Sequence, residues 1–176
     1  MNIKKHVITV ILVCLLSAIP IVASVYAKLP LNLSERIERE NSSDLCLTIY
    51  YSNPLALKFF PITNVEDLKE SSDKKIVVNG SDLEEHIDLF RQIGIDDLKP
   101  VVIKSSYLDL REYYVLESRK NGKLLDVAMW GAGNNSMIVN GVEVKENKIF
   151  GDVIMPFLSE EEAKDLERVI NGEILY

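Results

Sequence analysis

Two Asn-Gly pairs, each between stretches in which apolar and polar residues alternate, constrain the fold of this chain most strongly. The pairs are Asn121-Gly122 and Asn140-Gly141, and the flanking stretches are residues 112–119, 123–130, 136–139 and 142–146. Asn-Gly favours the positive φ angles of type I′ hairpin turns, and alternation with a period of two is typical of strands. The middle of the chain is therefore predicted to form an antiparallel meander of four strands.

Two helices are predicted from capping boxes, in which a serine precedes a glutamate by three residues. The two pairs are Ser81 with Glu84 and Ser159 with Glu162. We expect the first helix to run over residues 82–93, and the second to end at Asn171-Gly172, where glycine tolerates the left-handed conformation of a helix end.

Further strands are predicted at residues 45–60, as a hairpin or one bent strand, and at 76–78 and 101–104. Strands that come in runs, with the helices segregated from them, are typical of an α+β fold. We expect a mostly antiparallel sheet with two main helices packed on one face. With 47% apolar residues, the chain can bury one core, assigned to residues 45–176. Residues 28–44 are polar and are expected to form a spacer.

The N-terminus has the layout of a secretory signal peptide. Lys4 and Lys5 precede residues 7–27, which are 21 residues without a charged side chain. Signal cleavage is predicted after Ala27. An uncleaved membrane anchor is the alternative, because 21 residues in a helix span about 30 Å. Both alternatives place the rest of the chain outside the cytoplasm, either secreted or on the extracytoplasmic face of the membrane, with membrane contact only through residues 7–27.

Beyond residue 27 the chain has one cysteine, Cys46, and one histidine, His86. A structural zinc site takes four ligands and a catalytic one three protein ligands, so we expect no metal site, and no cofactor. These two residues are the catalytic candidates, because a thiol enzyme would need a Cys46-His86 dyad. The simpler interpretations are a small apolar side chain on a strand and a histidine within the apolar stripe of a helix.

Acidic residues outnumber basic ones in the part of the chain that follows the apolar segment. Without Lys4 and Lys5, 18 basic and 27 acidic residues remain. Nucleic-acid binding needs a local basic stripe, and the basic residues here form only isolated pairs. Nucleic acid is therefore excluded as the expected partner, which leaves a protein or a component of the cell envelope.

A glycine-rich loop at residues 130–136 supplies three binding candidates, Trp130, Asn134 and Asn135, and the tyrosines of the predicted strands supply a fourth, Tyr113. A wide hairpin loop and cross-strand packing are the structural alternatives. Several carboxylates qualify by composition for acid-base catalysis and none by motif. They are Asp109, Glu112, Glu117, Asp126 and Glu143.

The order of a signal, a strand, a capped helix and two Asn-Gly hairpins over about residues 75–170 resembles small uncharacterised secreted or membrane-anchored proteins of low-GC Gram-positive bacteria. The resemblance implies a bacterial envelope location and a sheet-plus-helix fold. It supplies no catalytic residue.

The scarcity of histidine and cysteine favours a non-catalytic extracytoplasmic binding or interaction domain, acting through the exposed sheet face and the loops around Trp130. One alternative is an envelope-associated hydrolase that uses carboxylates or the Cys46-His86 pair. Another is a secreted inhibitor or immunity-type protein that binds a basic partner.

Overall fold

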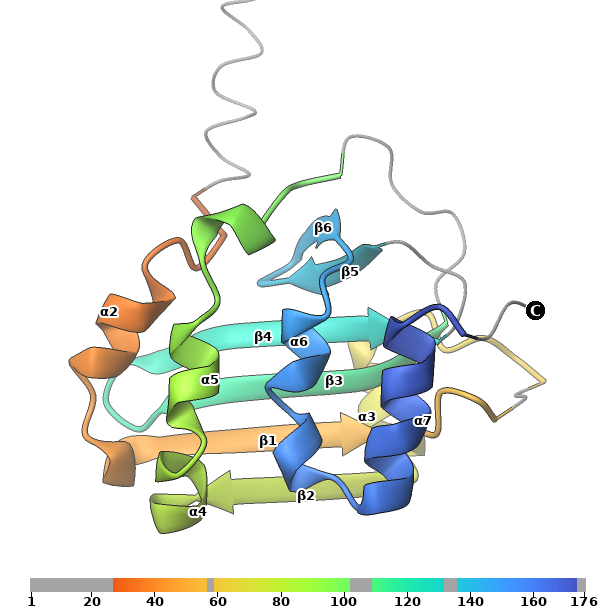
Figure 1. Cartoon of the computed structure of the whole chain (residues 1–176), viewed down its shortest axis with the longest axis horizontal. Coiled ribbons are helices and arrows are strands. Elements are labelled where there is room, and N and C mark those ends of the chain that lie inside the picture. Colours follow the sequence, from red (N-terminus) through yellow and green to blue (C-terminus); the bar gives the residue numbers. More distant parts are fainter. Residues whose placement is uncertain (1–26, 57–58, 102–108, 132–135, 174–176) are drawn as a thin grey trace, which may run out of the picture.

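The computed structural model describes residues 27–56, 59–101, 109–131 and 136–173 (Figure 1). Within these ranges six antiparallel strands form one sheet in the order β2-β1-β3-β4-β5-β6. The strands are β1 (Leu45–Tyr51), β2 (Lys74–Asn79), β3 (Leu110–Ser118), β4 (Gly122–Trp130), β5 (Ser136–Val139) and β6 (Val142–Lys145). The predicted meander of four consecutive strands, β3 to β6, is confirmed.

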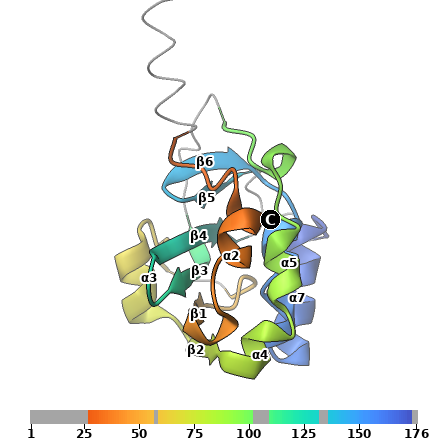
Figure 2. The same cartoon turned by 90° about the vertical axis from the view of Figure 1, so that its left-hand side faces the viewer.

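Helices cover the two faces of the sheet unequally. They are α2 (Leu33–Glu38), α3 (Val65–Ser71), α4 (Gly80–Glu84), α5 (Ile87–Arg91), α6 (Ile149–Asp152) and α7 (Glu160–Ile170). Seen along the sheet, α5 and α7 lie on one side, and α3 lies on the other (Figure 2). The predicted α+β fold with an antiparallel sheet is therefore confirmed.

The main core lies between the sheet and the helices α5, α6 and α7. Alternate residues of β1, Leu45, Leu47 and Ile49, are buried on this face. They belong to the same apolar cluster as Phe90 of α5 and Phe150 of α6. This alternation fixes which face of every neighbouring strand is buried, because successive side chains of a strand point to opposite faces.

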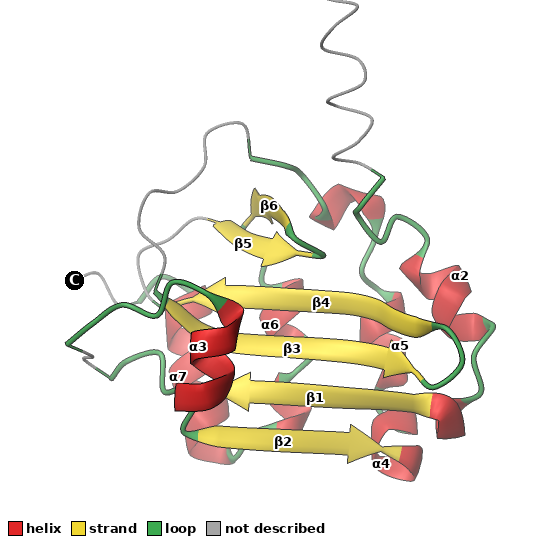
Figure 3. Cartoon of the chain, turned by 180° about the vertical axis from the view of Figure 1, so that it is seen from behind, coloured by secondary structure: helices red, strands yellow, loops and turns green. Residues whose placement is uncertain are grey.

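A second, smaller core lies under α3 on the opposite face of the sheet, where α3 covers only one end of the strands (Figure 3). Leu68 of α3 packs there with Tyr113 of β3 and Trp130 of β4. The side chain of Asn64 accepts a hydrogen bond from the backbone N–H of Asp67 at 2.8 Å and so caps the first turn of α3.

Residues 28–44 were expected to be a spacer, and the structure instead places part of this segment in the main core. Leu33 and Ile37 of α2 are each 1% exposed and belong to the main apolar cluster. The Arg36 guanidinium donates hydrogen bonds to the carbonyls of Lys123 and Leu124 on β4. The segment thus belongs to the domain. The sequence does not reveal this, because a helix of only six residues has just one pair of apolar residues at the four-residue helical spacing, among charged neighbours.

The helix predicted over residues 82–93 is split into α4 and α5, which corrects that prediction. The backbone of His86 leaves the helical region, with φ −115° and ψ 2°. Ser81 lies inside α4, which begins at Gly80, and its hydroxyl donates to the Asp82 carboxylate instead of capping a helix. The apolar stripe of the segment is kept across the break, since Leu83, Ile87 and Phe90 are all buried.

The two Asn-Gly pairs form different turns. At Asn140-Gly141, with φ angles of 48° and 75°, Val139 pairs directly with Val142, which is the predicted two-residue type I′ turn. At Asn121-Gly122 only Gly122 has a positive φ, of 67°, and Ser118 pairs with Gly122 across a longer loop. The type I′ prediction is therefore right for the second pair and wrong for the first.

The C-terminal helix follows its prediction closely. The backbone N–H of Glu162 donates to the Ser159 hydroxyl, and the N–H of Ser159 donates to the Glu162 carboxylate, which is the expected capping box. The helix ends before Gly172, whose φ is 67°. By contrast, the strand expected over residues 45–60 ends at Tyr51, and most of the strand expected at 101–104 lies outside the described residues.

Candidate functional site

A glutamate without a hydrogen-bond partner is buried near the start of β3. Glu112 occupies the same face of the strand as Tyr114 and Leu116, which belong to the main core. Its side chain is fully buried, and within the described ranges neither carboxylate oxygen has a hydrogen-bond partner. A carboxyl group in this state is destabilising for the fold, because it has lost water without gaining a protein donor.

Burial raises the pKa of Glu112 well above its usual value of 4.5. The neighbouring Arg111 guanidinium lowers this pKa, and the Asp109 carboxylate raises it, but desolvation is the largest effect. Arg111 itself is engaged by Asp109, with 2.5 Å between Nη2 and Oδ2. The Glu112 carboxyl is therefore protonated at pH values where an exposed glutamate is already ionised.

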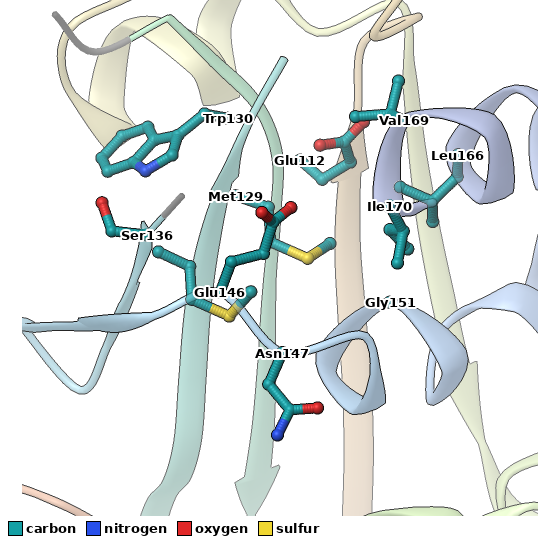
Figure 4. A pocket seen from close by; sticks show the side chains of 11 residues that line it. Glu112, Met129, Trp130, Ser136, Glu146, Asn147, Gly151, Leu166, Val169 and Ile170 are labelled. Atoms are coloured by element: carbon teal, nitrogen blue, oxygen red, sulfur yellow. The ribbon is translucent and has the colours of Figure 1, made fainter. Parts of the chain in front are cut away.

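Glu112 lines a small cavity between the sheet and the helices α6 and α7 (Figure 4). The cavity leaves about 20 Å³ for the centre of a water-sized group, which is roughly the room of one water molecule. The lining residues are Glu112, Met129, Trp130, Ser136, Met137, Glu146, Asn147, Gly151, Leu166, Val169 and Ile170. Figure 4 shows the carboxyl groups of Glu112 and Glu146 between Trp130 on one side and the α7 side chains on the other.

The sheet opens at this cavity because β4 and β5 pair over only part of their length. Val127 pairs with Val139, and Ala128 pairs with Ile138. Beyond these pairs, Met129 and Trp130 of β4 and Met137 of β5 line the cavity. The cavity thus lies where the pairing of β4 with β5 ends, and side chains of both strands form its wall.

Glu146 brings a second carboxyl group to the cavity from the segment that follows β6. Glu146 is exposed as a residue, and desolvation of its carboxyl group raises its pKa above the usual value. The neighbouring Asn147 amide donates a hydrogen bond to the Asp97 carboxylate at 2.6 Å, which fixes this segment against the rest of the domain. Two carboxyl groups with raised pKa values therefore share one cavity, a pattern that is enriched at functional sites.

The wall formed by α6 and α7 depends on a close approach at Gly151. A Cβ atom at this position would lie 2.0 Å from Cδ1 of Ile170 and 3.3 Å from its Cγ1. Glycine is therefore required by packing here, and the Ile170 side chain is held against the cavity by this contact.

The variant Gly151→Ala is expected to lower the free energy of unfolding by about 1–3 kcal/mol, because the added methyl group overpacks the α6–α7 contact. Urea unfolding measures this change. Valine lacks the Cδ1 atom, so the additional change Ile170→Val is expected to recover part of the loss. The single variant Ile170→Val is the control. If the double variant loses as much unfolding free energy as the two single variants together, overpacking against Ile170 is not the cause.

Two of the four residues predicted for binding are described by the structure, and they lie in different surroundings. Trp130 lines the cavity, and its Nε1 is buried without a hydrogen-bond partner within the described part of the chain. Tyr113 lies in the core under α3, where Lys69 Nζ is 5.2 Å from the centre of its ring. Asn134 and Asn135 lie outside the described residues.

The structure does not bring the two catalytic candidates together. Cys46 alternates with the buried Leu45 and Leu47 on β1, so its half-buried side chain points away from the main core. His86 lies on the core side, with its ring edge-on to Phe157 at 5.3 Å between ring centres. Ala27, where signal cleavage is predicted, lies in an exposed turn.

Sequence reasoning included Glu112 only as one of several carboxylates and missed Glu146. A signal for Glu112 was present, because it shares the alternation of Tyr114 and Leu116, and a charged residue in the buried register of a strand is unusual. Glu146 likewise continues the alternation of the buried Val142 and Val144 in the predicted strand 142–146, although β6 itself ends at Lys145.

Searches for known site types and relatives add no assignment. In the described ranges, no group of three or more His, Cys, Asp or Glu residues is arranged to hold a metal ion. None of the helices in these ranges is long and apolar enough to span a membrane. No family model, curated protein or solved structure matches the chain.

Proposed function

We propose that this chain is a non-catalytic binding domain, which receives a small polar group of its ligand in the Glu112 cavity. The observation that carries the proposal is the fully buried Glu112 carboxyl, whose two oxygens lack a donor within the described residues. A ligand that supplies the missing donor would recover the hydrogen bonds that folding leaves unmade. Trp130, predicted as a binding residue from the sequence, borders the same cavity.

The cost of this arrangement supports a binding role. An unpartnered polar group in an apolar environment costs on the order of 1–3 kcal/mol in proteins, and an apolar residue of similar volume would avoid that cost. Departures of this kind from the rules of core packing occur mainly at functional sites, where stability is lost in exchange for function.

The test uses the methionines of the cavity as reporters. Full-length protein labelled with ¹³C at the methionine methyl groups is titrated with small alcohols, amides, amines and carboxylates. Binding in the cavity is expected to shift the methyl signals of Met129 and Met137, which line it, and not that of Met155, which lies in the turn before α7. If no compound moves the two cavity signals, the proposed function is wrong.

We also propose that the domain acts outside the cytoplasm, on the support of Lys4, Lys5 and the uncharged segment 7–27. The expected result is an intact mass in the culture supernatant that corresponds to a chain beginning at Lys28, or a membrane fraction that retains residues 1–27. The mass of native protein from both fractions distinguishes these results. A full-length chain recovered only from the cytoplasm would contradict the proposed location.

A second candidate is a hydrolase that uses Glu112 and Glu146, because two carboxyl groups with raised pKa values in one cavity can serve as acid and base. The room of about one water molecule favours binding over catalysis, since a scissile bond and an attacking water need more space. Hydrolysis of an envelope glycan, peptide or ester that Glu112→Gln abolishes without unfolding would favour the hydrolase.

A further inference from the structure

We infer that the group received in the Glu112 cavity is a primary ammonium on an apolar stem, that is, a free alkylamine or a lysine side chain. This inference rests on the proposed binding function and names its ligand class. It follows from the hydrogen-bonding character of the cavity, from its size and from its walls.

Hydrogen-bond acceptors outnumber free donors around the cavity. The carboxyl groups of Glu112 and Glu146 provide four oxygens, and those of Glu112 have no donor within the described residues. Among the donors, the Ser136 hydroxyl already bonds Glu143 at 2.7 Å, and the Asn147 amide bonds Asp97. Among the described side chains that line the cavity, the buried donors left without a partner are Trp130 Nε1 and the O–H of the protonated Glu112 carboxyl, which is lost when Glu112 ionises. The complementary ligand group therefore carries several donors, as an ammonium does with its three N–H bonds.

The size of the cavity separates an ammonium from other cations. About 20 Å³ of room admits one group of the size of water, which an ammonium nitrogen with its hydrogens matches. A guanidinium is a planar group with three nitrogen atoms and needs more space. A divalent cation needs more oxygen ligands than two carboxyl groups supply, and the described residues contain no third acidic, His or Cys ligand placed for one.

The walls of the cavity suit the carbon chain that carries an ammonium. Met129, Met137, Leu166, Val169 and Ile170 are all apolar lining residues. Because the cavity itself has room for the ammonium group only, the methylene groups of a lysine-like ligand would leave it past these apolar side chains while the charge meets a carboxylate. The chain as a whole has a formal charge of −7, which favours the approach of a cation.

A bound ammonium would also relieve the electrostatic strain at Glu112. Burial raises the pKa of this carboxyl group, and an opposite charge within hydrogen-bond distance favours its ionised form. The proton of Glu112 then passes to solvent, and the carboxylate forms charge-assisted hydrogen bonds to the ammonium. Arg111, the basic residue nearest in sequence, pairs with Asp109 through Nε and Nη2, and its buried Nη1 has no hydrogen-bond partner among the described residues.

The test titrates full-length protein, with ¹³C-labelled methionine methyl groups, with n-butylammonium. We expect saturable shifts at Met129 and Met137, no shift at Met155, and at least tenfold weaker binding by Glu112→Gln. The matched control is Glu117→Gln, which changes an exposed residue of the same strand and should leave the affinity unchanged. Should Glu112→Gln fail to fold, Glu146→Gln is measured in its place and should also weaken binding.

Further compounds in the same titration separate the possible outcomes. n-Butanol, n-butylguanidinium and magnesium chloride are expected to bind at least tenfold more weakly than n-butylammonium. Equal or tighter binding of any of them overturns the ammonium assignment and leaves the binding function in place. Failure of every compound to shift Met129 and Met137 overturns both. A peptide with blocked ends and one lysine shows which molecule supplies the ammonium group. If the peptide binds more tightly than n-butylammonium, the ligand is a lysine side chain. If it binds more weakly, the ligand is a free amine.

Discussion

Replacing Glu112 with leucine is expected to stabilise the folded chain by about 1–3 kcal/mol at pH 7, because the variant removes a buried carboxyl group that has no described partner. Leucine is close in volume to glutamate, and the neighbouring Met129 and Leu166 provide apolar contacts for it. Most substitutions of buried residues destabilise a protein, so an increase in stability would identify Glu112 as a residue kept for function.

The effect of Glu112→Leu is expected to grow with pH. Burial raises the pKa of Glu112 in the folded chain above its usual value of 4.5, so between these two pKa values the unfolded chain releases a proton that the folded chain retains. In this window the unfolding free energy of the wild type falls by up to about 1.4 kcal/mol per pH unit, and above the folded pKa the loss is complete. The Glu112→Leu variant has no carboxyl group at this position, so its unfolding free energy lacks this pH-dependent fall.

Urea unfolding of both proteins at several pH values from 4.5 upward measures the difference. Glu146, whose pKa is also raised, remains in both proteins, so its contribution cancels in the comparison. The control Glu117→Leu changes an exposed residue of β3, and its effect on the free energy of unfolding at pH 7 should stay within about 0.5 kcal/mol. Parallel curves for the wild type and Glu112→Leu would mean that the carboxyl group is partnered in solution.

The variant Ile37→Ala is expected to lower the free energy of unfolding by about 2–5 kcal/mol. The Ile37 side chain is 1% exposed in the main core, next to the equally buried Leu33. Removing its side chain leaves a cavity between α2 and the rest of the core, and cavities of this kind are only partly filled by relaxation.

The same measurement distinguishes a core helix from a spacer. Leu31→Ala is the control in the same segment, because Leu31 is 42% exposed, and its change should stay within about 0.5 kcal/mol. An equally small effect for Ile37→Ala would contradict the packing of α2 and support the spacer expected from the sequence.

The elements that were predictable from sequence are those that local interactions determine. The type I′ turn at Asn140-Gly141 needs only two residues that tolerate positive φ. The capping box of α7 likewise involves only Ser159 and Glu162.

The features that sequence reasoning missed depend on contacts between distant parts of the chain. The break at His86 follows the packing of Leu83 and Phe90 against the same core, which a local capping signal does not reveal. The burial of α2 depends on its contacts with α5 and β4. In such places tertiary packing overrides the intrinsic secondary-structure preferences of the residues.

The candidate site was only partly predictable for the same reason. Trp130 was proposed from its loop, and the buried position of Glu112 could be read from its alternation with Tyr114. The cavity itself requires the early end of the β4–β5 pairing and the approach of Gly151 to Ile170. Neither of these has a local sequence signal, because both are set by how separate elements meet.

The most direct test of this account is a pH titration of the Glu112 side-chain carboxyl by ¹³C NMR in the folded, ligand-free protein. We predict that Glu112 remains protonated at pH values well above the usual glutamate pKa of 4.5, and that adding n-butylammonium ionises it at constant pH. Ionisation of Glu112 together with the exposed glutamates, in the absence of any ligand, would contradict the account.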